Sequence, residues 1–317
     1  MSGLVGGLGA RLRALRDVTR AHPQRYALRD RLATLDPQTQ AHEIYRAQAM
    51  LDLAWETRFG LNLALYRTFA VPRIARLLAA TGEMTGNPHK RAFDTGLWMY
   101  ELIEHGMEHD RGREVVRGLN RMHRRYEIAD EDYRYVLATF VVVPTRFIDD
   151  VGWRASTAVE REAVAAFYAR LGQLMGISDV PVGYEGFAAF FDAYEAAHIA
   201  YSEAGAAQMR ATATVIAQAL PGRARWLAEP ATAAMLEPRL AAALGLAPPP
   251  PGLRALLRLV LRGRAARERR RAPARTGWFV PGRKGREVYP HGYEIADLGP
   301  DWLRQPPGSP TSPPFPS

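Results

Sequence analysis

Residues 111–130, RGREVVRGLNRMHRRYEIAD, decide the fold that this chain is expected to adopt. Apolar side chains recur in them every three or four positions, which predicts one helix with an apolar face. Those side chains are Val115, Leu119, Met122 and Tyr126. His123 lies beside Met122 at one edge of this face, and Asn120 lies toward the other edge. The imidazole should therefore point inward, either as a hydrogen-bonded core residue or as a metal ligand.

A second helix is predicted upstream, in residues 90–104, KRAFDTGLWMYELIE. One stripe of this helix is polar at its start and apolar at its end. The stripe consists of Arg91, Asp94, Thr95, Trp98 and Leu102. Polar groups that enter an apolar stripe cost free energy unless they are paired or bind a ligand, so the stripe is a candidate site. The alternative is an ion pair between Arg91 and Asp94 near the start of the helix.

Four segments, in this order along the chain, resemble the oxygenase family of the fungal MpaB enzyme and the bacterial latex-clearing proteins. They are YRTFAVPRIARLLAATGEM (66–84), KRAFDTG (90–96), GREVVRGLNRMHRRY (112–126) and YVLATFVVVPTRFIDDVGWR (135–154). The resemblance extends over most of residues 36–240. It implies an all-α fold with a globin-like helical core around haem b, and it makes His123 the proximal ligand of the iron.

The family's distal R-x-x-K-T motif corresponds to Arg91, Asp94 and Thr95 of this chain. Asp94 stands in the position of the lysine, so a lysine cannot bind the resting iron here and the distal chemistry must differ. The glutamate that the family uses as a distal base has no counterpart at a comparable spacing, and Glu83 is only a distant candidate. The resemblance therefore implies the haem fold more strongly than it implies rubber cleavage.

The function expected from this resemblance is a haem b-dependent oxygenase that uses O2 to attack a carbon–carbon double bond of an apolar, isoprenoid or lipid-like substrate. Arg91 and Thr95 would donate hydrogen bonds where negative charge develops, and Asp94 would accept or relay a proton. The residues expected around the cofactor are His123, Arg91, Trp98, Asn120 and Arg154. The alternative is a haem-binding carrier or sensor without oxygenase chemistry, because the lysine and the glutamate are missing.

The composition is typical of a globular chain and restricts its chemistry. The 317 residues are 47% hydrophobic and include no cysteine. Disulfides, iron–sulfur clusters, thiolate-bound haem and thiolate zinc sites are thereby excluded, so histidines and carboxylates must bind any metal. Residues 1–20 lack the pattern of a secretory signal, and no apolar run reaches the roughly 20 residues of a membrane span. These features favour a cytoplasmic location.

The chain is expected to have three parts: an N-terminal segment (1–35), a helical haem-binding domain (36–247) and a C-terminal part (248–317). Within the domain, one helix should begin at Asp36 and another should continue from Tyr133 to Pro144. The C-terminal part should contain a proline spacer, a basic amphipathic helix and a disordered tail.

The positive charge of the chain is concentrated in the C-terminal part. Residues 252–291 contain eleven arginines and one lysine against two glutamates, a local net charge of +10, whereas the whole chain carries +9. The core itself is not basic, so we expect no nucleic-acid partner. The amphipathic segment LRALLRLVLRGRAARERRR has two expected locations. It can lie on the anionic inner face of a membrane, through residues 252–275, or pack on the core with its arginines in solvent.

The sequence HGMEH matches the H-x-x-E-H motif of zinc hydrolases through His105, Glu108 and His109. That motif needs a firm helix and a third ligand downstream. Gly106 and the charged residues around it indicate a solvent-facing helix end instead.

Two further constellations offer alternatives. Asp149 and Asp150 form an acidic pair that suits magnesium, but a third carboxylate is absent. The nearby Arg154 and Glu160 are expected to be structural or to lie close to haem propionates. His198 is the main rival for the position of metal ligand, and its alternative role is that of a core histidine bonded to a tyrosine.

Overall fold

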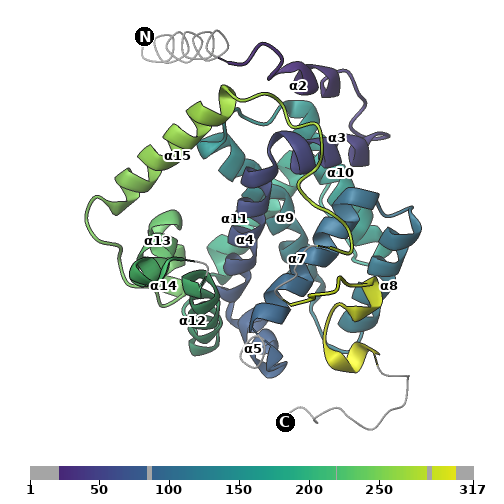
Figure 1. The fold of residues 1–317 in the computed structure, drawn as a ribbon. Coiled ribbons are helices and arrows are strands. Elements are labelled where there is room, and N and C mark those ends of the chain that lie inside the picture. The colour runs from purple at the N-terminus through teal and green to yellow at the C-terminus, as the bar shows by residue number, and fades with distance from the viewer. Residues whose placement is uncertain (1–20, 84–87, 219, 284–287, 305–317) are drawn as a thin grey trace.

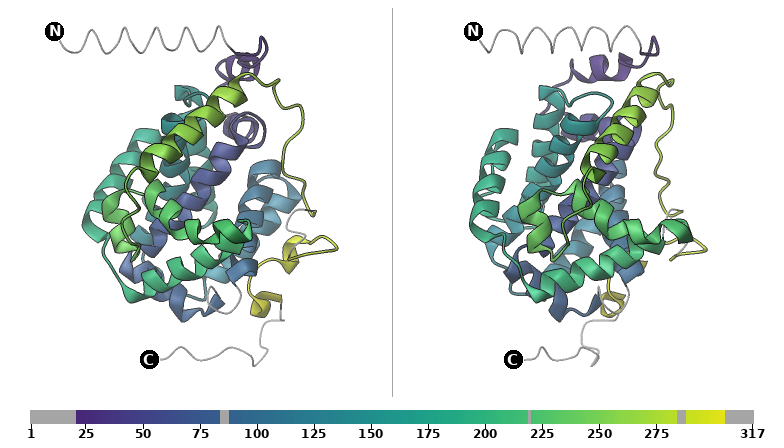
Figure 2. Two further views of the ribbon diagram at one scale, coloured as in Figure 1. Left: turned by 60° about the vertical axis from the view of Figure 1, so that its left-hand side comes forward. Right: turned by 90° about the vertical axis from the view of Figure 1, so that its left-hand side faces the viewer.

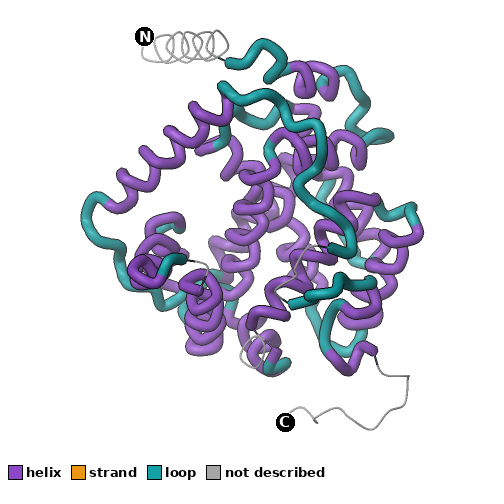
Figure 3. Tube along the Cα trace, in the orientation of Figure 1, coloured by secondary structure: helices purple, strands orange, loops and turns teal. Residues whose placement is uncertain are grey.

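The computed structural model describes residues 21–83, 88–218, 220–283 and 288–304. Within these residues it contains helices and loops but no strand (Figure 3). The predicted all-α class is therefore confirmed. No helix in these ranges combines the length and the apolar character that crossing a membrane requires. Residues 1–20 and most of the expected disordered tail lie outside the described part of the chain.

The helical elements follow one another in this order along the chain. The first half of the described chain contains α2 (Ala27–Leu32), α3 (Ala41–Ala47), the π-helical turn η1 (Gln48–Asp52), α4 (Ala54–Phe69), α5 (Pro72–Ala80), α7 (Pro88–His105) and α8 (Asp110–His123). The second half contains α9 (Asp130–Val151), α10 (Ala158–Leu174), α11 (Gly183–His198), α12 (Glu203–Gln218), η2 (Gly222–Leu227), α13 (Ala228–Met235), α14 (Pro238–Ala243), α15 (Leu253–Arg269), η3 (Ile295–Asp297) and η4 (Asp301–Arg304).

Helices α4 and α9 form the centre of the bundle (Figure 1). A Cβ atom on Gly60 of α4 would lie 2.4 Å from Cα of Pro144 in α9, so only glycine fits at this crossing. The predicted helix end at Pro144 is wrong, because α9 continues to Val151. Burial of Phe147 and Ile148 in the last turns offsets the roughly 3 kcal/mol that proline costs within a helix.

The helix predicted over residues 111–130 ends earlier than expected. Helix α8 ends at His123, and α9 begins at Asp130 after Ala129 in an extended conformation. The first turn of α9 contains three acidic residues, which favour a new helix start because they interact with the positive end of its dipole. His123 is consequently the last residue of α8.

The helix predicted to begin at Asp36 also has a different boundary. The Asp36 carboxylate accepts hydrogen bonds from the backbone N–H and the hydroxyl group of Thr39, at 3.1 and 2.5 Å. These bonds stabilise a local turn that competes with helix formation. Helix α3 therefore begins five residues later, at Ala41.

The C-terminal part returns to the bundle. Helix α15 packs beside α13 and α9 on the outside of the molecule (Figure 2). The chain then crosses back toward α7 and α8 (Figure 1), and both η3 and η4 pack against α8. Phe279, Tyr293 and Leu298 are buried in the same hydrophobic core as the preceding helices. The basic segment is therefore connected at both ends to elements that pack on the core.

Candidate functional site

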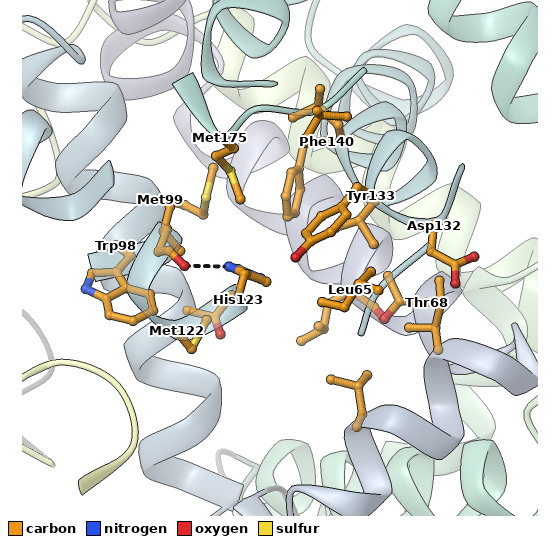
Figure 4. Close-up of a pocket in the computed structure, with 18 of the residues that line it drawn as sticks. Leu65, Thr68, Trp98, Met99, Met122, His123, Asp132, Tyr133, Phe140 and Met175 are labelled. Atoms are coloured by element: carbon orange, nitrogen blue, oxygen red, sulfur yellow. Dashed lines mark hydrogen bonds between the residues drawn. The ribbon is translucent and has the colours of Figure 1, made fainter. Parts of the chain in front are cut away.

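A cavity of about 190 Å³ lies between α4, α5, α7, α8, α9 and α10 (Figure 4). Its walls are mostly apolar and include the side chains of three methionines. Four of the residues predicted from the sequence line this cavity, namely Arg91, Thr95 and Trp98 of α7 and His123 of α8. The two segments in which the site was expected thus meet at one place.

His123 presents a free ring nitrogen to the cavity. Its Nδ1 atom lies 2.8 Å from the carbonyl oxygen of Leu119, one turn earlier in α8 (Figure 4). A carbonyl only accepts, so Nδ1 carries the hydrogen and Nε2 keeps its lone pair. Burial lowers the pKa of His123, and the charge of Arg91 lowers it further, so the ring is held neutral. This is the protonation state that a metal-binding imidazole requires.

Arg91 and Thr95 place a guanidinium and a hydroxyl group at the cavity. The Arg91 guanidinium donates a hydrogen bond to Thr95 Oγ1, one turn further along α7. Burial lowers the pKa of Arg91, while the charges of Asp94 and Glu83 oppose this effect. The guanidinium keeps its charge at neutral pH because its unperturbed pKa is far above 7. A positive charge thus faces an apolar space, which favours a ligand that is negative or becomes so.

Trp98 forms a wall of the cavity and is 4% exposed. The C-terminal part of the chain covers the other side of its indole ring. A Cβ atom on Gly299 would lie 2.9 Å from this ring, and Gly299 has φ of +95°, so glycine is required there on both counts. Residues far apart in the sequence therefore fix the position of Trp98.

Asp94 lies on the same helix but outside the cavity. Its carboxylate accepts hydrogen bonds from Lys90 Nζ at 2.6 Å, from Tyr289 OH at 2.6 Å and from the backbone N–H of Gly299 at 3.0 Å. Asp94 forms its ion pair with Lys90 and not with Arg91, which was the partner considered from the sequence. The geometry thus makes Asp94 an attachment point for the C-terminal part and gives it no contact with the cavity.

Asn120 and Arg154 also lie outside the cavity. The Asn120 amide donates to the carbonyl oxygen of Leu174 at 2.9 Å and so joins α8 to the end of α10. The Arg154 guanidinium is buried between the carboxylates of Asp52 and Glu160, at 2.6 and 2.5 Å. Of the two roles expected for Arg154, the geometry supports the structural one.

The zinc-hydrolase motif does not form a metal site. The rings of His105 and His109 stack with their centroids 4.7 Å apart, and His109 Nδ1 accepts the N–H of Arg111 at the start of α8. Glu108 pairs with Arg170 on the surface. Across the described residues, no group of three or more histidines, aspartates and glutamates is arranged to hold a metal ion.

The other candidate metal ligands, Asp149 and His198, contact residues outside the cavity. Asp149 accepts from the N–H of Ser156 and pairs with Arg161 at 2.7 Å. The His198 ring packs on Tyr194 with centroids 4.3 Å apart and does not line the cavity.

Tyr133 is a cavity residue that the sequence analysis missed. Its ring meets the ring of His123 edge-on, with centroids 5.6 Å apart, and its hydroxyl group points into the cavity (Figure 4). The helical spacing of Tyr133, Val136, Leu137 and Phe140 carried this information, because all four line the cavity from α9. Only the interruption between α8 and α9 brings Tyr133 beside His123.

The donor set of the cavity fits a haem better than a bare metal ion. One neutral imidazole cannot hold a free ion, but it suffices as the protein ligand of an iron that a macrocycle already holds. The cavity is smaller than the roughly 300–1,000 Å³ of common ligand pockets, so a haem must displace side chains. Met99, Met122 and Met175 line it, and their unbranched side chains move readily.

Comparisons with known proteins identify the family of the chain. Residues 50–268 match the family described as "ER-bound oxygenase mpaB/B'/Rubber oxygenase, catalytic domain". The ER-bound oxygenase mpaB' of Penicillium brevicompactum is 25% identical over 330 aligned positions, which cover 83% of this chain and 78% of that protein. The ER-bound oxygenases mpaB of Penicillium brevicompactum and Penicillium roqueforti (strain FM164) are each 32% identical over 156 positions. These positions cover 47% of this chain and 40% and 52% of the two relatives.

Proposed function

This chain belongs to the family of mpaB-type and rubber oxygenases, and on that premise we propose that it is a haem b-dependent oxygenase acting on a carbon–carbon double bond of an apolar, isoprenoid or lipid-like substrate. One observation carries the proposal. His123 donates its Nδ1 hydrogen to a backbone carbonyl, so the unprotonated Nε2 atom is left for a ligand in an apolar cavity.

In this proposal each cavity residue has a defined task. His123 holds the iron through Nε2, and the carbonyl oxygen of Leu119 fixes its tautomer. Bound haem supplies the redox-active iron that activates O2. Arg91 would stabilise negative charge on a reacting oxygen atom through its N–H groups. The Thr95 hydroxyl group, which accepts from Arg91 and donates to the Arg91 carbonyl oxygen at 3.3 Å, would turn its O–H toward the same atom. Tyr133 can donate a proton from its hydroxyl group, while Asp94 has no part because its carboxylate faces away from the cavity.

The test is an absorption spectrum of the purified protein before and after reduction with dithionite. We expect a Soret band in the unsubstituted protein and its loss in His123→Ala. The matched control is His198→Ala, which removes a histidine outside the cavity and should keep the band. Full haem loading of His123→Ala would contradict the assignment.

Thr95→Val tests the catalytic part of the proposal. It removes the hydroxyl group while keeping the volume of the side chain, so haem content should stay unchanged and turnover should fall about 10- to 100-fold. Unchanged turnover would exclude Thr95 from the reaction.

A second candidate is a haem-binding carrier or sensor without oxygenase chemistry. It is favoured by the absence of a free carboxylate base among the described lining residues. Asp132 is the carboxylate that reaches the cavity, and it is engaged by Arg73 at 2.6 Å and by the Tyr194 hydroxyl group. Oxidation of the reduced protein by O2, without a product from unsaturated isoprenoids or lipids, would support this candidate.

We further propose a cytoplasmic protein in peripheral contact with the inner face of a membrane through residues 252–275. Apolar substrates accumulate in lipid, so such a location would shorten their path to the cavity. Relatives of this chain are named ER-bound oxygenases, which supports a membrane location.

A further inference from the structure

Helix α15 exposes its apolar side. Leu256, Leu259 and Val260 are 55%, 67% and 57% exposed, although leucine and valine side chains are usually buried. Gly263 lies on the same side, and a Cβ atom added to it would meet nothing within 4 Å. We call these four residues the outer face of α15. The helix packs on α13 and α9 with several of its arginines in solvent, as one of the two expected locations requires, and the outer face stays exposed in this arrangement.

Arginines on the opposite side fix this orientation. Arg254 donates to backbone carbonyls at the end of α13, including that of Leu236 at 2.6 Å. Arg264 pairs with Glu56 at 2.8 Å, and its guanidinium lies 3.8 Å from the ring centroid of Trp55. Further along, Arg269 donates to the carbonyl oxygen of Trp153 at 2.9 Å. Rotation of the helix about its axis would break all of these contacts, so the outer face cannot turn inward.

The outer face is flanked by positive charge. Arg258 and Arg262 are exposed on one flank, and Arg267 is exposed one turn beyond Gly263 on the same side of the helix. No carboxylate of the described residues pairs with these three arginines. Glu268, the one acidic residue of the helix, is engaged by Arg25 at 3.2 Å and by Arg271 at 3.4 Å. The solvent side of α15 therefore combines exposed apolar side chains with unpaired cations.

Resting on the membrane contact proposed above for residues 252–275, we propose that the outer face of α15 is the surface that binds an anionic lipid bilayer. Leu256, Leu259 and Val260 enter the boundary between head groups and acyl chains, and the flanking arginines contact lipid phosphates. A second copy of the chain is a less suitable partner for the outer face. Packing two outer faces together would bring their unpaired arginines into proximity without a carboxylate to separate them.

The outer face and the cavity are separate. The described lining of the cavity comes from α4, α5, α7, α8, α9 and α10 and from the loops that adjoin them, and α15 contributes nothing to it. Serine substitutions at Leu256, Leu259 and Val260 should therefore leave the Soret spectrum unchanged and the protein folded. Failure of lipid binding and failure of the oxygenase assignment can thus be distinguished.

The first experiment measures co-sedimentation of the full chain with phosphatidylcholine vesicles, with and without phosphatidylserine. The variant Leu256→Ser/Leu259→Ser/Val260→Ser should bind the anionic vesicles at least ~10-fold more weakly, because three apolar side chains lose their lipid contact. Val182→Ser is the matched control, since Val182 is 89% exposed on another part of the surface. Binding by the triple variant equal to that of the unsubstituted chain would overturn the proposal.

The second experiment tests the charge. Arg258→Gln/Arg262→Gln should weaken binding to the anionic vesicles by about fivefold for each arginine at low salt, and it should reduce the dependence on salt. Arg121→Gln, at an exposed position of α8, is the control and should change neither quantity. The unsubstituted chain could instead form a dimer and fail to bind vesicles. If the triple serine substitution then dissociates this dimer, the partner of the outer face is a second copy of the chain and not a bilayer.

Discussion

The state of His123 follows from two local facts. It is the last residue of α8, so its Nδ1 atom reaches the carbonyl oxygen of Leu119, and it faces an apolar cavity, so protonation is disfavoured. Burial lowers the pKa of His123 and outweighs the hydrogen bond to Leu119, which raises it. The imidazole is therefore neutral over part of the pH range in which a free histidine is charged, and the hydrogen bond leaves Nε2 as the unprotonated nitrogen.

The lowered pKa of His123 predicts a dependence of stability on pH. In the unfolded chain its pKa is about 6.5, so protons bind to the unfolded state first as the pH falls below that value. The His123 contribution to the free energy of unfolding therefore decreases as the pH falls through about 6.5 and stops changing below the lowered folded-state pKa. Denaturant unfolding of cofactor-free protein should show that the free energy of unfolding falls more steeply with decreasing pH in the unsubstituted chain than in His123→Gln. Parallel curves would contradict the prediction.

Asp94→Ala should affect stability and leave cofactor binding intact. The substitution leaves Lys90 and Tyr289 without their buried acceptor, at a cost of about 2–3 kcal/mol. Thermal unfolding and the Soret absorbance of the folded fraction measure the two effects. Loss of haem from a folded variant would show that Asp94 acts at the cavity after all.

Sequence patterns identified the cavity residues that share one face of a single helix. Arg91, Thr95 and Trp98 share a stripe of α7, and helical spacing is enough to place them together. Asp94 belongs to the same stripe, but its direction is set by Tyr289 and Gly299, almost two hundred residues later. No periodicity within a helix contains that information.

Helices α4 and α9 show what limits prediction at the scale of elements. Pro144 suggested a helix end, yet α9 continues because its last turns are buried. Tertiary packing thus outweighed a local preference. The same packing explains a glycine that the sequence analysis did not single out, Gly60, which marks the closest contact of the two helices.

Gly60→Ala should therefore destabilise the protein by about 1–3 kcal/mol, because the added methyl group would collide with the backbone of Pro144. Gly263→Ala is the matched control, since open space surrounds Gly263 and alanine favours a helix by about 1 kcal/mol. The free energies of unfolding in urea should change in opposite directions. Equal effects would show that the α4–α9 crossing can relax.

On the scale of the whole molecule, the C-terminal part covers Trp98 and, through α15, forms part of the outer surface. Its charge and amphipathic character were evident from the sequence, but the side that faces outward was not. That side depends on partners such as Glu56 and the carbonyl oxygen of Trp153, which the sequence alone does not bring near α15. Long-range pairing of polar groups thus decided the orientation of the helix.

Ending the chain after Ala272 tests the role of this cover. The truncation removes Phe279, Tyr293 and Leu298 from the core and exposes Trp98, so the free energy of unfolding should fall by several kcal/mol. The emission of Trp98 should shift to longer wavelength, as measured against a chain that ends after Arg304. Unchanged stability would mean that residues 273–304 contribute nothing to the core.

The contact of Gly299 with Trp98 has a consequence for biosynthesis. All the described lining residues are made before residue 178 is added, but the wall behind Trp98 is completed only after Gly299 has left the ribosome. A nascent chain that ends between residues 178 and 299 contains every described lining residue, but one side of Trp98 is still uncovered. Closure of the wall behind Trp98 is thus one of the last steps in forming the cavity, and a chain that ends before Gly299 should be recognised by proteases through this open side.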